Sequence, residues 1–93
     1  MQFAWDSGKA RRNESKHRVT FVDAAEALAS DPRQINDLDV AHSDQETRWT
    51  VLARSSAGIV LRVTTVERDD TVRIISARRA SVPERTRYEQ EPR

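Results

Sequence analysis

The chain has 93 residues, enough for one domain over residues 1–93, and its 16 Lys or Arg against 15 Asp or Glu leave a net charge of +1. It contains no cysteine, which excludes thiolate catalysis, disulfides and sulfur-ligated zinc. No signal peptide or membrane-spanning run is recognisable, so we expect a cytoplasmic protein without a membrane partner.

Two helices are expected in the first half of the chain. An apolar start at residues 2–5, compatible with a short strand, precedes Asp6, which is a suitable N-cap for a helix that ends near His17. Thr20 is expected to cap a second helix, which the following Asp-Pro pair would end. The apolar residues of that helix recur at the spacing of one buried stripe and are Phe21, Ala24, Ala25 and Leu28.

The second half is expected to form a sheet and a last helix. Residues 33–46 are polar and aperiodic, so we expect a connection there, followed by strands at residues 47–54, 59–66 and 72–77. Ser81, with Pro83 in the first turn and Glu84 three positions on, predicts a capping box for a helix over residues 82–90. The fold class is therefore α+β, with two N-terminal helices, an antiparallel sheet of three to four strands and a C-terminal helix.

Charge is divided unevenly between these halves. Residues 1–47 hold six Lys or Arg against nine Asp or Glu, whereas residues 48–93 hold ten against six. Arginine accounts for 14 of the 16 basic residues, and its planar guanidinium can bind two oxygens of one phosphate. A GC-rich genome would produce the same arginine bias without any function. If the protein binds nucleic acid, the strand-rich half is expected to carry the phosphate contacts.

A set of short motifs extends over almost the whole chain. In order, they are Phe3-x-Trp5-Asp6-x-x-Lys9, Asn13-x-x-Lys16-His17-x-Val19-x-Phe21-x-Asp23-Ala24, His42-Ser43, Glu46-x-Arg48-Trp49, Glu67-Arg68, Arg73-Ile74-Ile75-Ser76-Ala77-Arg78-Arg79-Ala80, Glu84-Arg85 and Tyr88. In this order and at this spacing, they resemble the BrnT family, which are toxins of type II toxin–antitoxin systems. The Ile-Ile-Ser-Ala-Arg segment is the most specific part of the resemblance.

The resemblance implies a RelE-like ribonuclease fold, RNA cleavage that inhibits translation, and neutralisation by a BrnA-like antitoxin with a ribbon-helix-helix domain. It also implies a complex with two of each chain, which would reach operator DNA only through the antitoxin. The sequence departs from the family in three places. Arg18 stands where the family usually has Gly, Ala29-Ser30 replaces an aromatic residue, and Thr65-Val66 replaces an aromatic-Thr pair.

RNA cleavage without a metal or cofactor, which we expect here, needs a base for the 2′-OH, cations for the phosphorane charge and an acid for the leaving 5′-oxygen. Few side chains can move a proton, namely His17, His42, Glu67 and Tyr88, and His42 is expected to be solvated in its polar segment. The residues that we predict to be catalytic are Lys16, His17, Glu67, Arg68 and Arg78. The residues that we predict to bind RNA phosphates are Arg62, Arg73, Ser76, Arg79 and Arg85.

The last hairpin leaves two locations open for the site. Glu67 and Arg68 are expected at its turn, whereas Arg78 is expected at the far end of the strand, roughly 20 Å away. A single compact catalytic centre is not expected to contain both Arg78 and the pair of Glu67 and Arg68. The site is therefore expected either at the strand end, where Arg62 would lie near Arg78, or at the turn.

Alternation along the last strand predicts which side chains share a face. Arg78 is expected on the face of Ile74 and Ser76, and Arg73 is expected with Arg79 on the opposite face.

Each feature also has an ordinary structural explanation. Lys16 and His17 end a helix, where cations complement the helix dipole. The large aromatic residues are expected in the core rather than as platforms for RNA bases, and they are Phe3, Trp5, Phe21 and Trp49. A non-catalytic nucleic-acid-binding or protein-interaction domain, derived from such a toxin, therefore remains the alternative to a ribonuclease.

Overall fold

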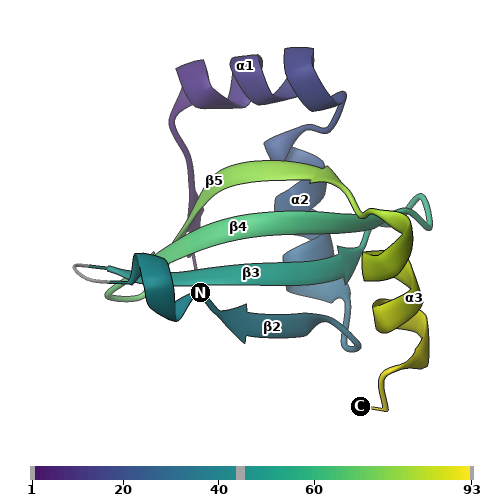
Figure 1. The fold of residues 1–93 in the computed structure, drawn as a ribbon. Helices are drawn as coiled ribbons and strands as arrows, with labels where there is room; N and C mark the ends of the chain where they lie inside the picture. The colour runs from purple at the N-terminus through teal and green to yellow at the C-terminus, as the bar shows by residue number, and fades with distance from the viewer. Residues whose placement is uncertain (1, 44–45, 93) are drawn as a thin grey trace.

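All three α-helices begin at the capping residues that the sequence indicates (Figure 1). The computed structural model describes residues 2–43 and 46–92. Asp6 caps α1 (Ser7–His17), and Thr20 caps α2 (Phe21–Ser30); each side chain accepts a backbone N–H three residues on. Ser81 forms the predicted capping box with Glu84 at the start of α3 (Val82–Gln90). No helix in the described part of the chain is long and apolar enough to span a membrane.

The sheet has five strands in the order β1-β5-β4-β3-β2, which is more than the three to four that we predicted. The strands are β1 (Gln2–Ala4), β2 (Ile35–Leu38), β3 (Thr47–Arg54), β4 (Val60–Arg68) and β5 (Thr71–Arg79). The prediction of a purely antiparallel sheet is wrong, because β1 pairs parallel with β5 at the edge of the sheet. The other pairs are antiparallel, so the sheet is mixed.

Strand β2 lies inside the segment that we predicted to be a connection. Its four residues contain only one buried side chain, Ile35, and they pair with residues 49–52 of β3. The strand is set by this pairing rather than by a local pattern, since four residues are too few to show a period. A single 3₁₀ turn, η1 (Val40–His42), follows it. Residues 44 and 45, in the same predicted connection, lie outside the described residues.

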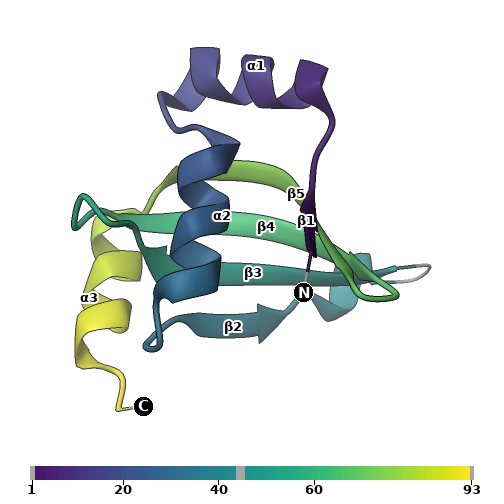
Figure 2. The same ribbon diagram turned by 180° about the vertical axis from the view of Figure 1, so that it is seen from behind.

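The helices cover the two faces of the sheet unequally (Figure 2). α2 crosses one face, α1 packs along β5, and α3 packs at one end of the opposite face. We call these the α2 face and the α3 face. The main core lies on the α2 face and consists of Val19, Phe21, Ala24, Ala27, Val51, Ala53, Leu61, Val63, Ile74 and Ala77. A smaller cluster beneath α3 consists of Ile35, Leu52, Val60 and Tyr88.

The predicted stripe of α2 and the predicted core aromatics are largely confirmed. Phe21 and Ala24 are buried, whereas Ala25 and Leu28 are half-buried against the core. Ala27, which we did not predict, is fully buried beside them. The other aromatic residues that pack against this core are Phe3, Trp5 and Trp49.

The hairpin of β4 and β5 is longer than predicted, so Glu67 and Arg68 lie in β4 rather than in the turn. Asp69 and Asp70 make the turn instead. Asp69 takes a left-handed backbone conformation (φ 54°), which Asp tolerates better than most residues because its side chain can bond locally.

A β-bulge in β5 changes which side chains share a face. Thr64 pairs with Ser76, but the next residue, Thr65, pairs with Ile74, so Ile75 is the extra residue. Because one residue is inserted, the alternation of side chains reverses beyond it. Arg78 shares a face with Ser76 and lies opposite Arg79, as predicted, but two predicted placements are wrong. Ile74 lies on the face opposite Arg78, and Arg73 shares the face of Arg78 rather than that of Arg79.

Candidate functional site

Six arginines of the described strands lie on the α3 face of the sheet, and one of them, Arg54, lies over the ring of Tyr88 of α3, apart from the other five. Residues paired across antiparallel strands share a face, and Arg62 pairs with both Arg78 and Leu52, which packs beneath α3. Four residues further along the strands, Val66 pairs with both Arg48 and Arg73. We call this set the arginine cluster, and its members are Arg48, Arg62, Arg68, Arg73 and Arg78.

Glu84, at the start of α3, links two members of the cluster. Arg78 donates from Nη1 and Nη2 to the two carboxylate oxygens at 2.8 and 3.1 Å, and Arg62 Nε lies 3.2 Å from Glu84 Oε2. The same carboxylate accepts the Ser81 backbone N–H at 2.7 Å. Hydrogen bonds from Arg78, and then from Ser81, lower the pKa of Glu84 to about 2 even though its partial burial opposes the shift. The carboxylate is therefore ionised at neutral pH and holds both guanidinium groups.

A hollow of about 490 Å³ opens on the α3 face between η1 and α3. We call it the His42 hollow. Its wall includes His42, whose Nδ1 lies 2.9 Å from Asp39 Oδ2. Because Nδ1 is engaged by Asp39, Nε2 is the ring nitrogen left for other partners. The other lining residues are Asp37, Leu38, Thr50, Leu52, Arg62, Glu84 and Arg87.

Arg62 is the member of the cluster that lines this hollow. Its Nε lies 3.2 Å from Glu84 Oε2, and Glu84 is the one carboxylate of the described residues with which Arg62 forms a salt bridge. Arg87, across the hollow, donates Nη2 to Asp37 Oδ1 at 3.0 Å. Hydrogen bonding from Arg87 lowers the pKa of Asp37, against a smaller opposing effect of burial. The hollow is therefore lined both by a cation, Arg62, and by a histidine that is held by a carboxylate.

The predicted phosphate-binding residues are partly brought together. Arg73 and Ser76 lie on the α3 face with Arg62 and Arg78, and Ser76 belongs to a polar row with Thr64. Two other predicted residues lie elsewhere. Arg79 lies on the α2 face and lines small hollows with Arg18 and with Arg85 near the β3–β4 loop.

The residues predicted to be catalytic do not form one centre. Glu67 and Arg68 are neighbours in β4, so they point to opposite faces. Arg68 is exposed and lies 3.4 Å from Glu46, at the far end of the α3 face. Lys16 and His17 end α1, which packs along β5, and they line neither the His42 hollow nor the hollow that Glu67 lines.

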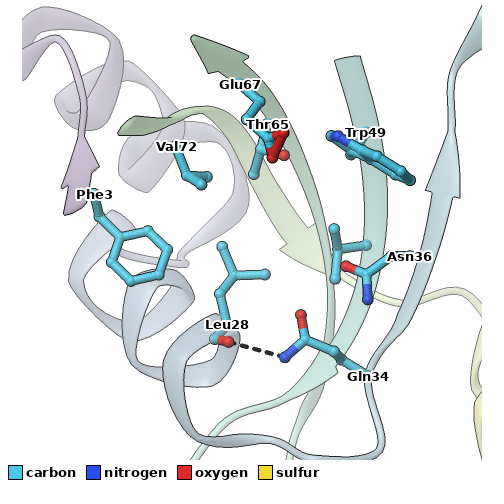
Figure 3. A pocket seen from close by; sticks show the side chains of 9 residues that line it. Phe3, Leu28, Gln34, Asn36, Trp49, Thr65, Glu67 and Val72 are labelled. Atoms are coloured by element: carbon cyan, nitrogen blue, oxygen red, sulfur yellow. Dashed lines mark hydrogen bonds between the residues drawn. The ribbon is translucent and has the colours of Figure 1, made fainter. Parts of the chain in front are cut away.

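Glu67 instead belongs to a hollow of about 380 Å³ on the α2 face, which we call the Trp49 hollow (Figure 3). Phe3 and Trp49 lie on either side of it, with Glu67 at one end. At the other end, Gln34 donates from Nε2 to the backbone carbonyl of Leu28 at 2.9 Å. The remaining lining residues are Asn36, Val51, Thr65 and Val72.

Sequence reasoning missed His42 and Asp39 as a pair. The signal was present, because the two residues are three apart and a short turn brings such residues together. This spacing alone is a weak signal, since nothing in the polar segment indicated that η1 would pack against the sheet. The described residues contain no group of three or more His, Cys, Asp or Glu arranged to hold a metal ion.

Comparison with known proteins agrees with this architecture. A family model described as "Ribonuclease toxin, BrnT, of type II toxin-antitoxin system" matches residues 5–84. The crystal structure of the ribonuclease toxin BrnT of Brucella abortus is similar, with a TM-score of 0.64 and 23% identity over 87% of this chain and 97% of that chain. At that identity, the likeness shows a common fold. No curated protein gives a significant match.

Proposed function

The chain belongs to the BrnT family of ribonuclease toxins of type II toxin–antitoxin systems, and from that premise we propose that it cleaves RNA in the His42 hollow. The observation that supports this location is that Arg62 lines the same hollow as His42. A cleavage site needs both a group that moves a proton and a cation for the phosphorane charge. Among the described residues, this hollow brings the two together.

We assign the proton transfer to His42. Its Nε2 takes the proton of the RNA 2′-OH, while Asp39 holds Nδ1 and stabilises the imidazolium that forms. The 2′-oxygen then attacks the phosphorus and the bond to the 5′-oxygen breaks, leaving a 2′,3′-cyclic phosphate and a 5′-hydroxyl. At this open site the leaving oxygen takes its proton from solvent. None of these steps requires a metal ion, so we propose metal-independent cleavage.

Arginines supply the positive charge that stabilises the phosphorane and bind the phosphates of the RNA backbone. Arg62 binds the phosphate that is cleaved, and Arg78 positions it by holding Glu84 against Arg62 Nε. Arg73 and Ser76 lie along the same face and bind the neighbouring phosphates. We assign no step to Lys16, His17, Glu67 or Arg68, because these residues lie outside the His42 hollow.

The biological role follows from the family. We propose that RNA cleavage by this RelE-like toxin inhibits translation in the cytoplasm. We further propose that a BrnA-like ribbon-helix-helix antitoxin neutralises it in a complex with two of each chain. Operator DNA would then be bound only by the antitoxin.

One observation favours the non-catalytic alternative. Glu84 already occupies much of the hydrogen-bonding capacity of Arg78 and part of that of Arg62. A domain that only binds RNA or protein would have the same ion pairs. The two functions differ in one respect, because only the ribonuclease needs His42.

Purified His42→Gln and Arg62→Ala variants test the proposal. We expect each to lower the rate of RNA cleavage by about 100-fold, because each removes a group that acts in the transition state. Arg11→Ala, which removes an exposed arginine from α1, is the matched control and should leave the rate unchanged. EDTA should also leave the rate unchanged. Full activity in His42→Gln would overturn this mechanism, and RNA binding without cleavage by the unmodified chain would favour the alternative.

A further inference from the structure

The Trp49 hollow is an apolar cavity that the proposed cleavage reaction does not use. It lies on the α2 face, whereas the arginine cluster lies on the α3 face. Its floor is formed by buried side chains of three strands, Val51, Thr65 and Val72, and half-buried Phe3 and Leu28 complete it. Apolar surface that a chain leaves open in this way is typical of a binding site.

Electrostatics decide between RNA and protein as the occupant. None of the described residues that line the hollow is a Lys or Arg. Its single charged lining residue is Glu67, whose carboxylate would repel the phosphates on either side of an inserted base. An apolar side chain flanked by a Lys or Arg satisfies both the cavity and the carboxylate. The hollow therefore favours a protein segment over an RNA base.

The position of the hollow connects it with the arginine cluster. β2 is the last strand of the sheet, so its outer edge carries unpaired backbone groups. Asn36 of β2 lines the Trp49 hollow, and Leu38 of the same strand lines the His42 hollow and is 48% exposed. A chain that begins in the Trp49 hollow can cross this free edge, cover Leu38 and reach Arg62 within a few residues.

We propose that the Trp49 hollow is the anchoring site for the antitoxin. The antitoxin segment inserts an apolar side chain between Phe3 and Trp49 and places a Lys or Arg against Glu67. From there it crosses the edge of β2 toward the His42 hollow. This proposal rests on the toxin–antitoxin family and on the location that we proposed for RNA cleavage.

The test measures the affinity of each variant for the purified cognate antitoxin, taken as the chain whose co-expression relieves growth arrest. Asn36→Trp fills the mouth of the hollow from an exposed strand position, and we expect it to weaken binding by about 30-fold, as for an interface hot spot. RNA cleavage by Asn36→Trp should be unchanged. Glu67→Arg should weaken binding similarly, and an antitoxin in which the facing cation is changed to Glu should restore it. Glu26→Arg, an exposed charge reversal on α2, is the matched control.

The possible outcomes are distinguishable. Unchanged antitoxin affinity in both Asn36→Trp and Glu67→Arg would overturn the proposal. Unchanged affinity together with altered RNA binding would identify the hollow as a base pocket instead. If the unmodified chain binds its antitoxin but cleaves no RNA, the ribonuclease mechanism fails while the affinity measurements still decide the anchoring site. Circular dichroism of each variant separates lost binding from lost folding.

Discussion

Asn13 of α1 occupies the place of a missing strand beside Ala77 of β5. Its side chain donates to the Ala77 carbonyl at 2.8 Å and accepts the Ala77 N–H at 3.0 Å, and it also donates to the Val19 carbonyl at 3.0 Å. β1 pairs with β5 only at residues 71–73, so the remainder of that edge has no neighbouring strand. One buried amide therefore ties α1, the α1–α2 link and β5 together.

Replacing this amide should be costly. We expect Asn13→Ala to lower the free energy of unfolding by about 3 kcal/mol, because it leaves buried backbone groups of Ala77 and Val19 without partners. In urea denaturation the midpoint should fall while the slope stays constant. Ser15→Ala, at an exposed position of the same helix, should have little effect. A loss below about 1 kcal/mol for Asn13→Ala would mean that water replaces the amide.

Glu84 should make stability depend on pH in a defined range. Its folded pKa is about 2, below the ordinary value of 4.5, so its contribution is present above the unfolded pKa and is lost as the pH falls toward 2. The side chain is 25% exposed, so we expect a discounted contribution of about 1–2 kcal/mol at pH 7. The difference in unfolding free energy between the unmodified chain and Glu84→Gln should therefore disappear between pH 5 and pH 2. Glu89→Gln is the control, because it shows the general effect of removing one negative charge from α3. If the difference in unfolding free energy between the unmodified chain and Glu84→Gln does not depend on pH, Glu84 does not have a lowered pKa in the folded chain.

Arg18 is expected to cost stability through its backbone. It ends α1 in the left-handed conformation, with φ 58°, where a β-carbon is disfavoured. Arg18→Gly should therefore raise the free energy of unfolding by about 0.5–1 kcal/mol, after allowance for the greater freedom of glycine in the unfolded chain. Thermal denaturation would measure the gain. Arg18→Ala keeps the β-carbon and should therefore show no gain in the free energy of unfolding. If Arg18→Gly is less stable than the unmodified chain, the contacts of the arginine side chain stabilise the fold by more than its left-handed backbone destabilises it.

The number of phosphate contacts can be counted from the effect of salt on RNA binding. Each cation that neutralises a phosphate of single-stranded RNA contributes about −0.7 to the slope of log affinity against log salt. We expect Arg73→Ala to make the slope less steep by about that amount, measured with an oligonucleotide that lacks the reactive 2′-OH. Arg33→Ala, an exposed arginine between α2 and β2, should leave the slope unchanged. If Arg73→Ala leaves the slope unchanged, the arginine cluster is not the RNA surface.

Much of the fold was predictable where the signal is local. The caps at Asp6, Thr20 and Ser81 each depend on residues three positions apart, and all three are confirmed. β1 and β2 depend instead on partners far along the chain, Thr71–Arg73 in one case and Trp49–Leu52 in the other. No pattern within three or four residues could indicate that pairing or its parallel direction.

The candidate site was predictable only in part for the same reason. Arg62 and Arg78 were expected to approach each other, and their direct pairing confirms this. Sequence could not show that Glu84 serves at once as a helix cap and as the counter-charge of both arginines, because that depends on where α3 docks. The position of η1, which makes His42 line the same hollow as Arg62, was equally hidden.

The bulge at Ile75 makes the register of β5, rather than the identity of its residues, decide which arginine faces the site. Because Ile75 is the inserted residue, deleting it would restore plain alternation and leave Arg78 toward Glu84 and Arg79 toward the core side. Losing the bulge at the present chain length would instead turn Arg79 toward Glu84 and Arg78 toward the core side. Related chains that differ by one residue here should therefore be compared by strand register, because a gapless alignment would equate arginines on opposite sides of the sheet. Loss of the bulge without loss of a residue would thus exchange Arg78 for Arg79 at the site without changing either residue.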